Sequence, residues 1–243
     1  MPISERLKAV AKMITPGLTV ADVGCDHAYL AIHLITEGIS KHVIAMDINK
    51  GPLERARENV DAAGLDDDIE LRLSNGLDEL NENEADCVVM AGMGGRLMID
   101  IMTRGSQVLK GVREIILQPQ SEVEYVRHYL EDNGYRIISE DIVFEDDKFY
   151  PMMKSIHGDM SLKKDLYYKF GSILLHEENP VLRMYLLSER DRLSGVKAEL
   201  ENAPLTARVD EGLKKVETEL ETINNALGYC EGINPVTIER VIK

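Results

Sequence analysis

Short apolar runs alternate with amphipathic stretches along the first 134 residues of the chain. Five of the apolar runs have the length of strands, at 18–24, 42–48, 69–76, 85–92 and 113–120. Stretches with helical spacing follow four of these runs, at 28–38, 51–64, 95–105 and 121–134. A hydrophobic period that switches in this order is typical of βα units. It predicts a mostly parallel sheet with helices on both faces.

Local signals refine these elements. Ser121 and Glu124 have the spacing of a capping box at the start of the helix predicted over 121–134. An amphipathic helix is also predicted at the N-terminus, where Ile3, Leu7, Val10 and Ile14 share one face. Charges are interspersed along it, so it does not resemble the apolar region of a signal peptide.

The pattern changes after residue 134. Residues 135–158 form two strand-like halves around the turn "EDDK", with no helix between them, which predicts an antiparallel hairpin. A parallel α/β sheet closed by an antiparallel strand is the architecture of class I methyltransferases, whereas a plain dinucleotide-binding domain is expected to continue with another βα unit. From residue 160 the chain is predicted to be helical. Leucine-rich faces on either side of "ENAPLT" (201–206) predict a coiled-coil hairpin. We therefore expect a Rossmann-like domain over 1–159 and a helical domain over 160–243.

Composition narrows the classes of function. The chain has 243 residues and a net charge of −15, and residues 1–159 hold most of the excess acid, with 29 Asp and Glu against 16 Lys and Arg. Three cysteines without a CxxC pair favour neither disulfides nor a zinc site. No apolar stretch approaches membrane-spanning length. We expect a cytoplasmic protein that binds no metal, DNA or membrane, as a monomer or weak dimer.

The first predicted strand ends in "VADVGCDHA", with a single glycine where dinucleotide-binding loops carry three. Gly24 allows the backbone to approach a ligand. Asp22 and Asp26 would repel a pyrophosphate, but they suit the ammonium and sulfonium groups of S-adenosylmethionine. His27 is a candidate for the same pocket. The alternative for Asp26 is that it only caps the following helix.

The next two strand ends supply further candidate cofactor residues. Asp47 lies 23 residues after Gly24, close to the sequence separation at which an acidic residue accepts hydrogen bonds from the ribose hydroxyls of a bound nucleotide. The next residue, Ile48, is a further candidate for binding the cofactor. Asn75, Gly76 and Leu77 follow the third strand, where Asn75 could contact the adenine edge and Leu77 its face. The alternatives are a surface acid at position 47 and an ordinary turn at 75–77.

The fourth and fifth strand ends read "AGMGG" (91–95) and "LQPQ" (117–120). Glycines on both sides of Met93 require tight backbone geometry and leave an open slot beside the ligand. Gly92 and Met93 are therefore expected beside the cofactor, and Gly94 and Gly95 beside the substrate. Gln118 and Gln120, separated by Pro119, carry amides that suit the edge of a base. Both segments could also be ordinary turns.

Taken together, "ADVGCDHAYL", "AGMGG" and "LQPQ", followed by the strand hairpin and the helical tail, resemble bacterial tRNA (adenine-N1)-methyltransferases of the TrmK type. This family joins a class I methyltransferase domain to a C-terminal coiled-coil hairpin and methylates N1 of adenine 22 in tRNA. The resemblance implies S-adenosyl-L-methionine as cofactor and tRNA as partner. It places Gly24, Asp26, His27 and Asp47 on the cofactor, residues 75–77 beside its adenine, and residues 93–95 near the transferred methyl group.

The substrate side is predicted more broadly. Gly94, Gly95, Gln118 and Gln120 are expected to receive the target adenine. Tyr29, Pro119, Tyr150, Lys163 and Lys164 are candidate RNA contacts. Two rival interpretations remain open: a methyltransferase acting on a small molecule or a protein, and a non-catalytic module that binds partners through the coiled coil.

Overall fold

The computed structural model describes residues 3–204 and 206–230. The strands are β1 (Val20–Val23), β2 (Val43–Asp47), β3 (Ile69–Leu73), β4 (Cys87–Gly94), β5 (Glu114–Ser121), β6 (Tyr135–Glu145) and β7 (Lys148–His157). The first helices are α1 (Glu5–Met13), α2 (Tyr29–Thr36), α3 (Lys50–Ala63), α4 (Gly95–Arg104), α5 (Ser106–Leu109) and α6 (Val123–Asp132). The later helices are α7 (Asp165–Phe170), α8 (Ser172–His176), α9 (Pro180–Glu201), α10 (Ala207–Leu227) and the 3-10 turn η1 (Gly228–Cys230).

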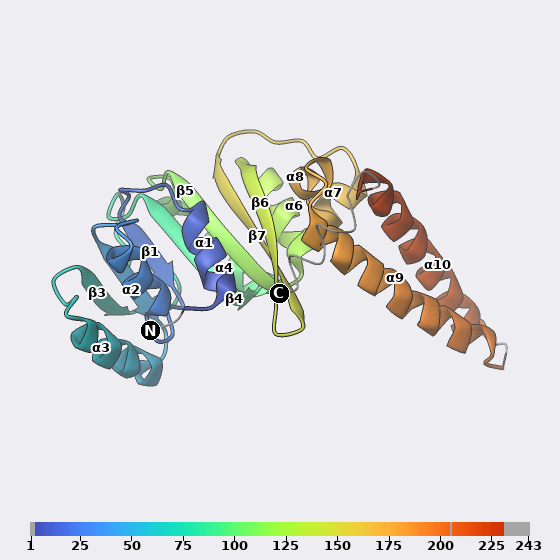
Figure 1. The fold of residues 1–243 in the computed structure, drawn as a ribbon. Coiled ribbons are helices and arrows are strands. Elements are labelled where there is room, and N and C mark those ends of the chain that lie inside the picture. Colours follow the sequence, from blue (N-terminus) through green and yellow to red (C-terminus); the bar gives the residue numbers. More distant parts are fainter. Residues whose placement is uncertain (1–2, 205, 231–243) are drawn as a thin grey trace. The chain divides into compact units, whose positions relative to one another are not determined.

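The seven strands form one sheet in the order β3-β2-β1-β4-β5-β7-β6 (Figure 1). The first five strands pair in parallel, and β7 pairs antiparallel with both β5 and β6. The strand order changes direction at β1, which lies between β2 and β4. Ligands of open α/β sheets bind outside the carboxyl ends of the strands at such a switch point. The predicted Rossmann-like methyltransferase fold with antiparallel closing strands is confirmed.

The sheet has a hydrophobic layer on each face. Buried residues of α1, α2 and α3 pack with one set of strand side chains, and those of α4, α5 and α6 pack with the other. Val20 and Ala21, neighbours on β1, belong to different layers because successive strand residues point to opposite faces. All residues of β1 and β2 are buried, which explains why their sequences are continuous apolar runs.

The strands β4 and β5 extend further than predicted. The strand β4 ends at Gly94 instead of residue 92 and β5 at Ser121 instead of residue 120, so "AGMG" (91–94) and "LQPQ" (117–120) both lie within strands and the alternative of ordinary turns is wrong. The ladder shifts register twice here, pairing Ala91 with Gln118, Met93 with Pro119 and Gly94 with Ser121. Residue 92 of β4 and residue 120 of β5 are therefore skipped by the pairing, one on each strand, as in β-bulges.

The predicted capping box at the start of α6 is wrong. Ser121 still belongs to β5, and the residue preceding the helix is Glu122, in a left-handed conformation with φ 55° and no capping hydrogen bond from its side chain. The double bulge carries the strand one residue further than its hydrophobic pattern indicates. Ser121 therefore does not occupy the capping position of α6.

The hairpin of β6 and β7 has the predicted turn. Asp146 and Asp147 both have positive φ, 49° and 58°, as in the two-residue turns that match strand twist. The strand that joins the sheet next to β5 is β7, which comes second in the hairpin.

Two compact units are distinguished, residues 1–161 and 162–243, against a predicted boundary between 159 and 160. In the second unit α9 and α10 pack against each other as a hairpin, with Leu182, Leu186, Leu193, Val216 and Ile223 buried. The short helices α7 and α8 had no distinct signal in the sequence because each has only about one turn or two. Within the described residues, no helix combines the length and the hydropathy needed to cross a membrane.

Candidate cofactor and substrate site

Asp22 is a buried carboxylate with an unsatisfied oxygen. It lies within β1 with a side chain that is shielded from solvent, and it is 4% exposed. Its Oδ2 is the one buried side-chain polar atom in the described part of the chain without a hydrogen-bond partner. Burial, and then repulsion from Asp47, raise the pKa of Asp22 to about 7. Buried polar atoms normally have partners, so this atom marks a position where a ligand donor fits.

The loop after β1 is shaped by its backbone. Gly24 has φ 77°, and the N–H groups of Gly24 and Cys25 both donate to the carbonyl of Met46, at 2.7 and 2.9 Å. The space beside Gly24 is filled by Met93, since a β-carbon on Gly24 would clash with its Cε atom. The glycine therefore permits the end of β4 to approach the first loop.

Asp26 does not cap α2. Ala28 is the capping residue, with φ 59° and no side-chain hydrogen bond, so the capping alternative for Asp26 is wrong. Asp26 itself has φ 49°, and its N–H donates to Oδ2 of Asp47 at 3.4 Å. The other oxygen of Asp47 accepts from the N–H of Asn49 at 2.8 Å. Both turns thus orient the Asp47 carboxylate at the carboxyl end of β2.

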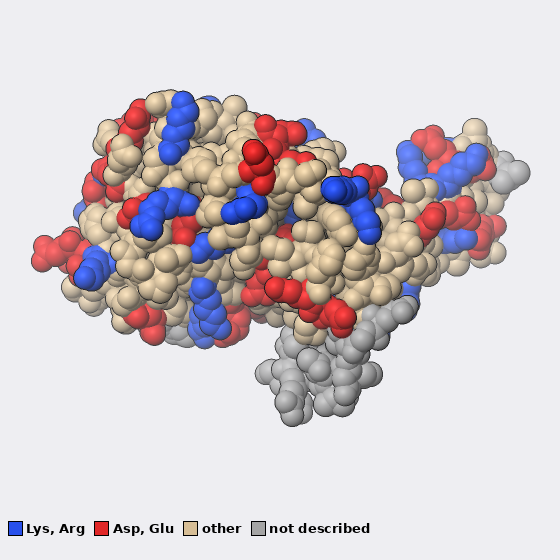
Figure 2. Space-filling view, turned by 90° about the horizontal axis from the view of Figure 1, so that it is seen from above, with Lys and Arg blue, Asp and Glu red and all other residues tan. Residues whose placement is uncertain are grey.

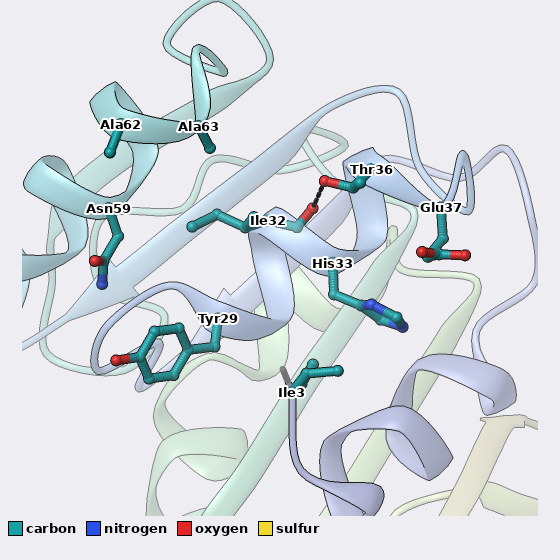
Figure 3. Close-up of a pocket in the computed structure, with 9 residues that line it drawn as sticks. All are labelled: Ile3, Tyr29, Ile32, His33, Thr36, Glu37, Asn59, Ala62 and Ala63. Atoms are coloured by element: carbon teal, nitrogen blue, oxygen red, sulfur yellow. Dashed lines mark hydrogen bonds between the residues drawn. The ribbon is translucent and has the colours of Figure 1, made fainter. Parts of the chain in front are cut away.

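His27 and Tyr29 lie on the side of the loop that faces α3. Their rings are 5.4 Å apart, and the carbonyl of His27 accepts from Nδ2 of Asn59 at 3.0 Å. Tyr29 also lines a hollow of about 410 Å³ between α2 and α3 (Figure 3). The hollow is lined by Ile3, Tyr29, Ile32, His33, Thr36, Glu37, Asn59, Ala62 and Ala63. None of these residues comes from β4 or β5, which carry the predicted substrate slot.

The cofactor residues predicted after β2 and β3 differ in their exposure to solvent. Ile48 is 58% exposed beside Asp47, and Asn75 is exposed with its Oδ1 accepting from Nη2 of Arg104 at 3.3 Å. Leu77 is 2% exposed in the core, so the prediction that its side chain packs on the cofactor adenine is wrong. Gly76 has φ 66°, and its backbone lies against the side chain of Ile101 in α4.

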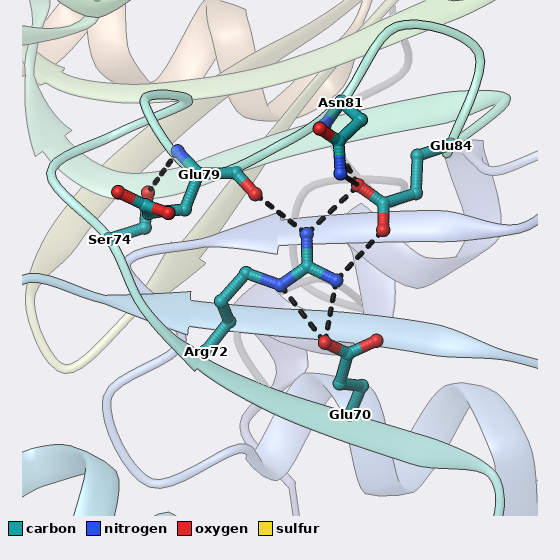
Figure 4. Close-up of polar contacts among 6 residues, drawn as sticks. All are labelled: Glu70, Arg72, Ser74, Glu79, Asn81 and Glu84. Carbon is teal, nitrogen blue, oxygen red and sulfur yellow. Dashed lines mark hydrogen bonds and ion pairs between the residues drawn. The ribbon is translucent and has the colours of Figure 1, made fainter.

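Arg72 holds the loop that carries these residues (Figure 4). Its guanidinium donates to Glu70, to the carbonyl of Glu79 at 2.7 Å and to both oxygens of Glu84, at 2.8 and 2.9 Å. The hydrogen bond with Arg72 is the main reason why the pKa of Glu84 falls to about 2.

The double bulge joins the two unusual motifs. Gly92 has φ 81°, and its N–H donates to Oε1 of Gln118 at 3.1 Å. Gly95 begins α4 against the backbone of the neighbouring segment, because a β-carbon there would lie 2.7 Å from the carbonyl of Ser121. Gly94 is less crowded, since a β-carbon at this position would lie 3.2 Å from Oγ of Ser121. Gly95 is buried and Gly94 partly exposed.

The side chains of Gln118 and Pro119 are shielded from solvent. Gln118 is fully buried and Pro119 is buried, so the predicted substrate contacts of both side chains are wrong. Gln118 Oε1 accepts from Arg6 as well as from Gly92, and Nε2 donates to the Pro119 carbonyl at 3.3 Å. Gln120, skipped by the strand pairing, is exposed beside Gly92.

Arg6 is the residue that the sequence analysis missed. Its Nη1 donates to Gln118 at 2.8 Å, and its guanidinium lies over the ring of Tyr150, 5.5 Å from the centroid. Tyr150 therefore does lie near the β4–β5 end, as a partner of Arg6. Nothing in the N-terminal sequence marks Arg6, because its importance depends on the packing of α1 against the sheet.

The two candidate lysines belong to the second unit. Lys163 is exposed, while Nζ of Lys164 donates to the hydroxyl of Tyr229 at 2.6 Å and lies over the rings of Tyr167 and Tyr229. The face in Figure 2 shows basic and acidic side chains interspersed. In the residues that the structure describes, no His, Cys, Asp and Glu side chains are grouped as a metal would require.

The comparisons with known proteins agree with this arrangement. The model of a family described as a methyltransferase domain matches residues 3–153. The tRNA (adenine(22)-N(1))-methyltransferase of Bacillus subtilis (strain 168) is 30% identical over 236 residues, 94% of this chain and 98% of the relative. A crystal structure of the B. subtilis M1A22 tRNA methyltransferase TrmK has 30% identity and a TM-score of 0.82, covering 93% of this chain and 98% of that one. A Streptococcus pneumoniae protein in complex with S-adenosyl-L-methionine has 33% identity and a TM-score of 0.83, covering 93% and 100%. The chain belongs to the tRNA (adenine(22)-N(1))-methyltransferase family.

Proposed function

We propose that this protein transfers a methyl group from S-adenosyl-L-methionine to N1 of adenine 22 in tRNA. The observation that carries the proposal is the likeness to the B. subtilis enzyme over 94% of this chain, which includes the helical unit as well as the methyltransferase domain. A methyltransferase fold alone would leave the substrate open.

The residues at the switch point fit the cofactor. Asp22 offers an unsatisfied buried carboxylate oxygen for the ammonium group. Asp47 can accept from the ribose hydroxyls, and the exposed side chain of Ile48 can cover an adenine ring. Gly24, Asp26, His27, Asn75, Gly76, Gly92 and Met93 complete the proposed surroundings, with Leu77 contributing through its backbone.

The slot for the target base is proposed at the β4–β5 bulges. Gly92, Gly94 and Gln120 provide accessible backbone and an exposed amide. Gly95, Gln118 and Pro119 are assigned a positioning role, because they are buried beneath this surface. Tyr150 remains a candidate for stacking on RNA, and Tyr29, Lys163 and Lys164 for contacts with the rest of the tRNA.

The proposed methyl transfer does not require a general base. Bound S-adenosylmethionine supplies an electrophilic methyl group on a sulfonium. Adenine N1 carries an in-plane lone pair, so no proton needs to be removed before it attacks. The contribution of the protein is then orientation of the two reactants. Since N1 lies on the Watson–Crick edge, the slot must hold a nucleotide turned out of its stack, which costs a few kcal/mol.

The test uses the full chain, labelled S-adenosylmethionine and unmodified tRNA. Digestion to nucleosides should release labelled 1-methyladenosine, and a tRNA with guanine in place of adenine 22 should release none. Cofactor binding without RNA labelling would favour the rival acceptors, a small molecule or a protein. Loss of cofactor binding as well would favour a non-catalytic module. A cytoplasmic location and a monomer or weak dimer belong to the same proposal.

A further inference from the structure

Arg6 presents a guanidinium group in a fixed orientation. Its Nη1 donates to the buried oxygen of Gln118 at 2.8 Å, and Gln118 is itself held by the N–H of Gly92 at 3.1 Å. The ring of Tyr150 covers the guanidinium, with a centroid distance of 5.5 Å. The hydrogen bond uses one nitrogen and the ring lies against the central carbon, while Nε and Nη2 donate no hydrogen bond to any described residue. A guanidinium held in this way loses little entropy when it binds a ligand.

The charge of Arg6 is not neutralised by a carboxylate. Among the described residues, none of the ion pairs includes Arg6. The nearby carboxylate of Glu145 accepts from the backbone N–H groups of Glu5 and Arg6, at 2.7 and 3.3 Å. In the part of the chain that the structure describes, six other arginines pair with carboxylates, namely Arg72, Arg96, Arg104, Arg127, Arg190 and Arg192. Among the described residues of this chain, which has 43 acidic and 28 basic residues, Arg6 and Arg183 are partly buried arginines without an ion pair. Arg183 lies in α9 of the second unit, whereas Arg6 lies beside Gly92.

The position of Arg6 links it to both proposed ligands. A β-carbon on Gly92 would lie 3.6 Å from its Nη1 and 3.7 Å from the amide of Gln120, so Arg6 borders the proposed slot for the base. The next residue, Met93, contacts Gly24 in the cofactor loop. The carboxylate of Asp22, within β1 just before that loop, has the opposite charge and an unsatisfied oxygen.

We infer that Arg6 binds an oxyanion of one of the two reactants, either the α-carboxylate of S-adenosylmethionine or a phosphate beside the target adenosine. The inference rests on the proposed function. Arginine binds carboxylates and phosphates through paired N–H donors, and the free edge of Arg6 offers this geometry. With the carboxylate as ligand, Asp22 and Arg6 hold the two opposite charges of one amino-acid group. With a phosphate as ligand, Arg6 anchors the RNA backbone beside the slot.

The experiment compares full-length Arg6→Gln and Arg6→Lys with wild type. Arg113→Gln is the matched control, since Arg113 is an exposed arginine that directly precedes β5, at the amino-terminal end of a strand whose carboxyl end carries Gln118. One arm measures calorimetric binding of S-adenosylhomocysteine, which carries the carboxylate, and of 5′-methylthioadenosine, which lacks the amino-acid group. The other arm measures tRNA affinity between about 50 and about 200 mM salt. Thermal melting reports whether each variant is folded.

The expected result is a selective loss in one arm. Arg6→Gln should bind S-adenosylhomocysteine about 10-fold or more weakly while retaining methylthioadenosine, or should reduce the salt slope for tRNA by about one phosphate contact. Arg6→Lys should recover part of the loss, and Arg113→Gln should behave as wild type. Weaker binding of S-adenosylhomocysteine alone identifies the cofactor carboxylate as the ligand of Arg6. A reduced salt slope for tRNA identifies a phosphate.

Two outcomes would overturn the inference. One is an unchanged result for Arg6→Gln in both arms. The other is an equal loss for both nucleosides without recovery in Arg6→Lys, because a purely structural role of the Gln118 contact predicts that pattern. Failure of the proposed function is seen separately, as absence of 1-methyladenosine from reactions with the wild-type protein.

Discussion

The side-chain oxygen of Gln118 accepts a hydrogen bond from the N–H of Gly92 at 3.1 Å, across the double bulge of β4 and β5. Gly92 has φ 81°, and the shifted register leaves its N–H for this buried amide. The two motifs "AGMGG" and "LQPQ" are therefore parts of one local structure. The glycine-rich end of β4 keeps its conformation because Gln118, in the second motif, accepts the hydrogen bond from the N–H of Gly92.

Gln118→Ala should destabilise the protein, with methylation lost as a consequence. The substitution removes the acceptor for Gly92 and Arg6 and leaves a cavity, so we expect a loss of about 2 to 4 kcal/mol in the free energy of unfolding. Gln120→Ala is the matched comparison, because Gln120 is exposed. It should stay within about 0.5 kcal/mol of wild type and lower only the methylation rate. Denaturant melts and initial rates separate the two effects, and equal stability of both variants would contradict the assignment.

Gly95→Ala should also be destabilising. The new β-carbon would lie 2.7 Å from the carbonyl of Ser121 and 2.8 Å from that of Glu122, both on the backbone. Overpacking of this kind costs about 1 to 3 kcal/mol. Gly51→Ala is the control, since Gly51 lies in the first turn of α3 with no atom within 4 Å of the new carbon. It should be neutral or stabilise by up to about 1 kcal/mol. Thermal unfolding of the two variants side by side provides the test.

Cofactor binding should depend on pH through Asp22, whose pKa is raised to about 7. Above pH 7 the carboxylate is ionised and can pair with the ammonium of the cofactor. Below pH 7 a proton must leave first, so affinity for S-adenosylhomocysteine should fall by about tenfold per pH unit. Calorimetry from pH 5.5 to 8.5 measures the profile. Asp22→Asn should bind more weakly, with a flat profile, and an unaltered slope in that variant would assign the titration to another group.

Asp22 should also affect stability, with the opposite sign. The pKa of Asp22 rises from 3.8 to about 7 on folding, so its contribution to stability is fully present below pH 3.8 and is lost as pH rises through about 7. Asp22→Asn should therefore raise the melting temperature of the ligand-free protein more at pH 8 than at pH 5. A difference that is larger at pH 5 would rule out this account.

Arg72 should stabilise the loop after β3 mainly above pH 4.5. The pKa of Glu84 falls from 4.5 to about 2 because Arg72 donates to it, so the stabilisation is complete above pH 4.5 and is lost as pH falls towards 2. Arg72→Gln should melt below wild type at pH 6, and the gap should narrow in acid. Glu82→Gln, which removes an exposed acid from the same loop, should match wild type throughout. A gap that persists at pH 2 would point to packing instead.

The sequence by itself determined the order of strands and helices along the chain, the hairpin that closes the sheet, and the class of cofactor. These follow from short-range physics, namely the hydrophobic period, turn residues such as Asp146 and Asp147, and acidic residues in or just after the ends of strands. It also placed Asp22, Gly24, Asp26 and Asp47 near one another, because the carboxyl ends of neighbouring parallel strands converge.

Only the tertiary structure decided which of the predicted residues can touch a ligand. Gln118, Pro119 and Leu77 were predicted as contacts from their positions in the motifs, and all three are buried, because the register of the bulges and the packing of α4 turn them inward. Arg6 is distant in sequence from Gln118 and Tyr150, yet the packing of α1 brings it to both. Contacts between elements depend on register and helix packing over the whole sheet, and no local pattern records them.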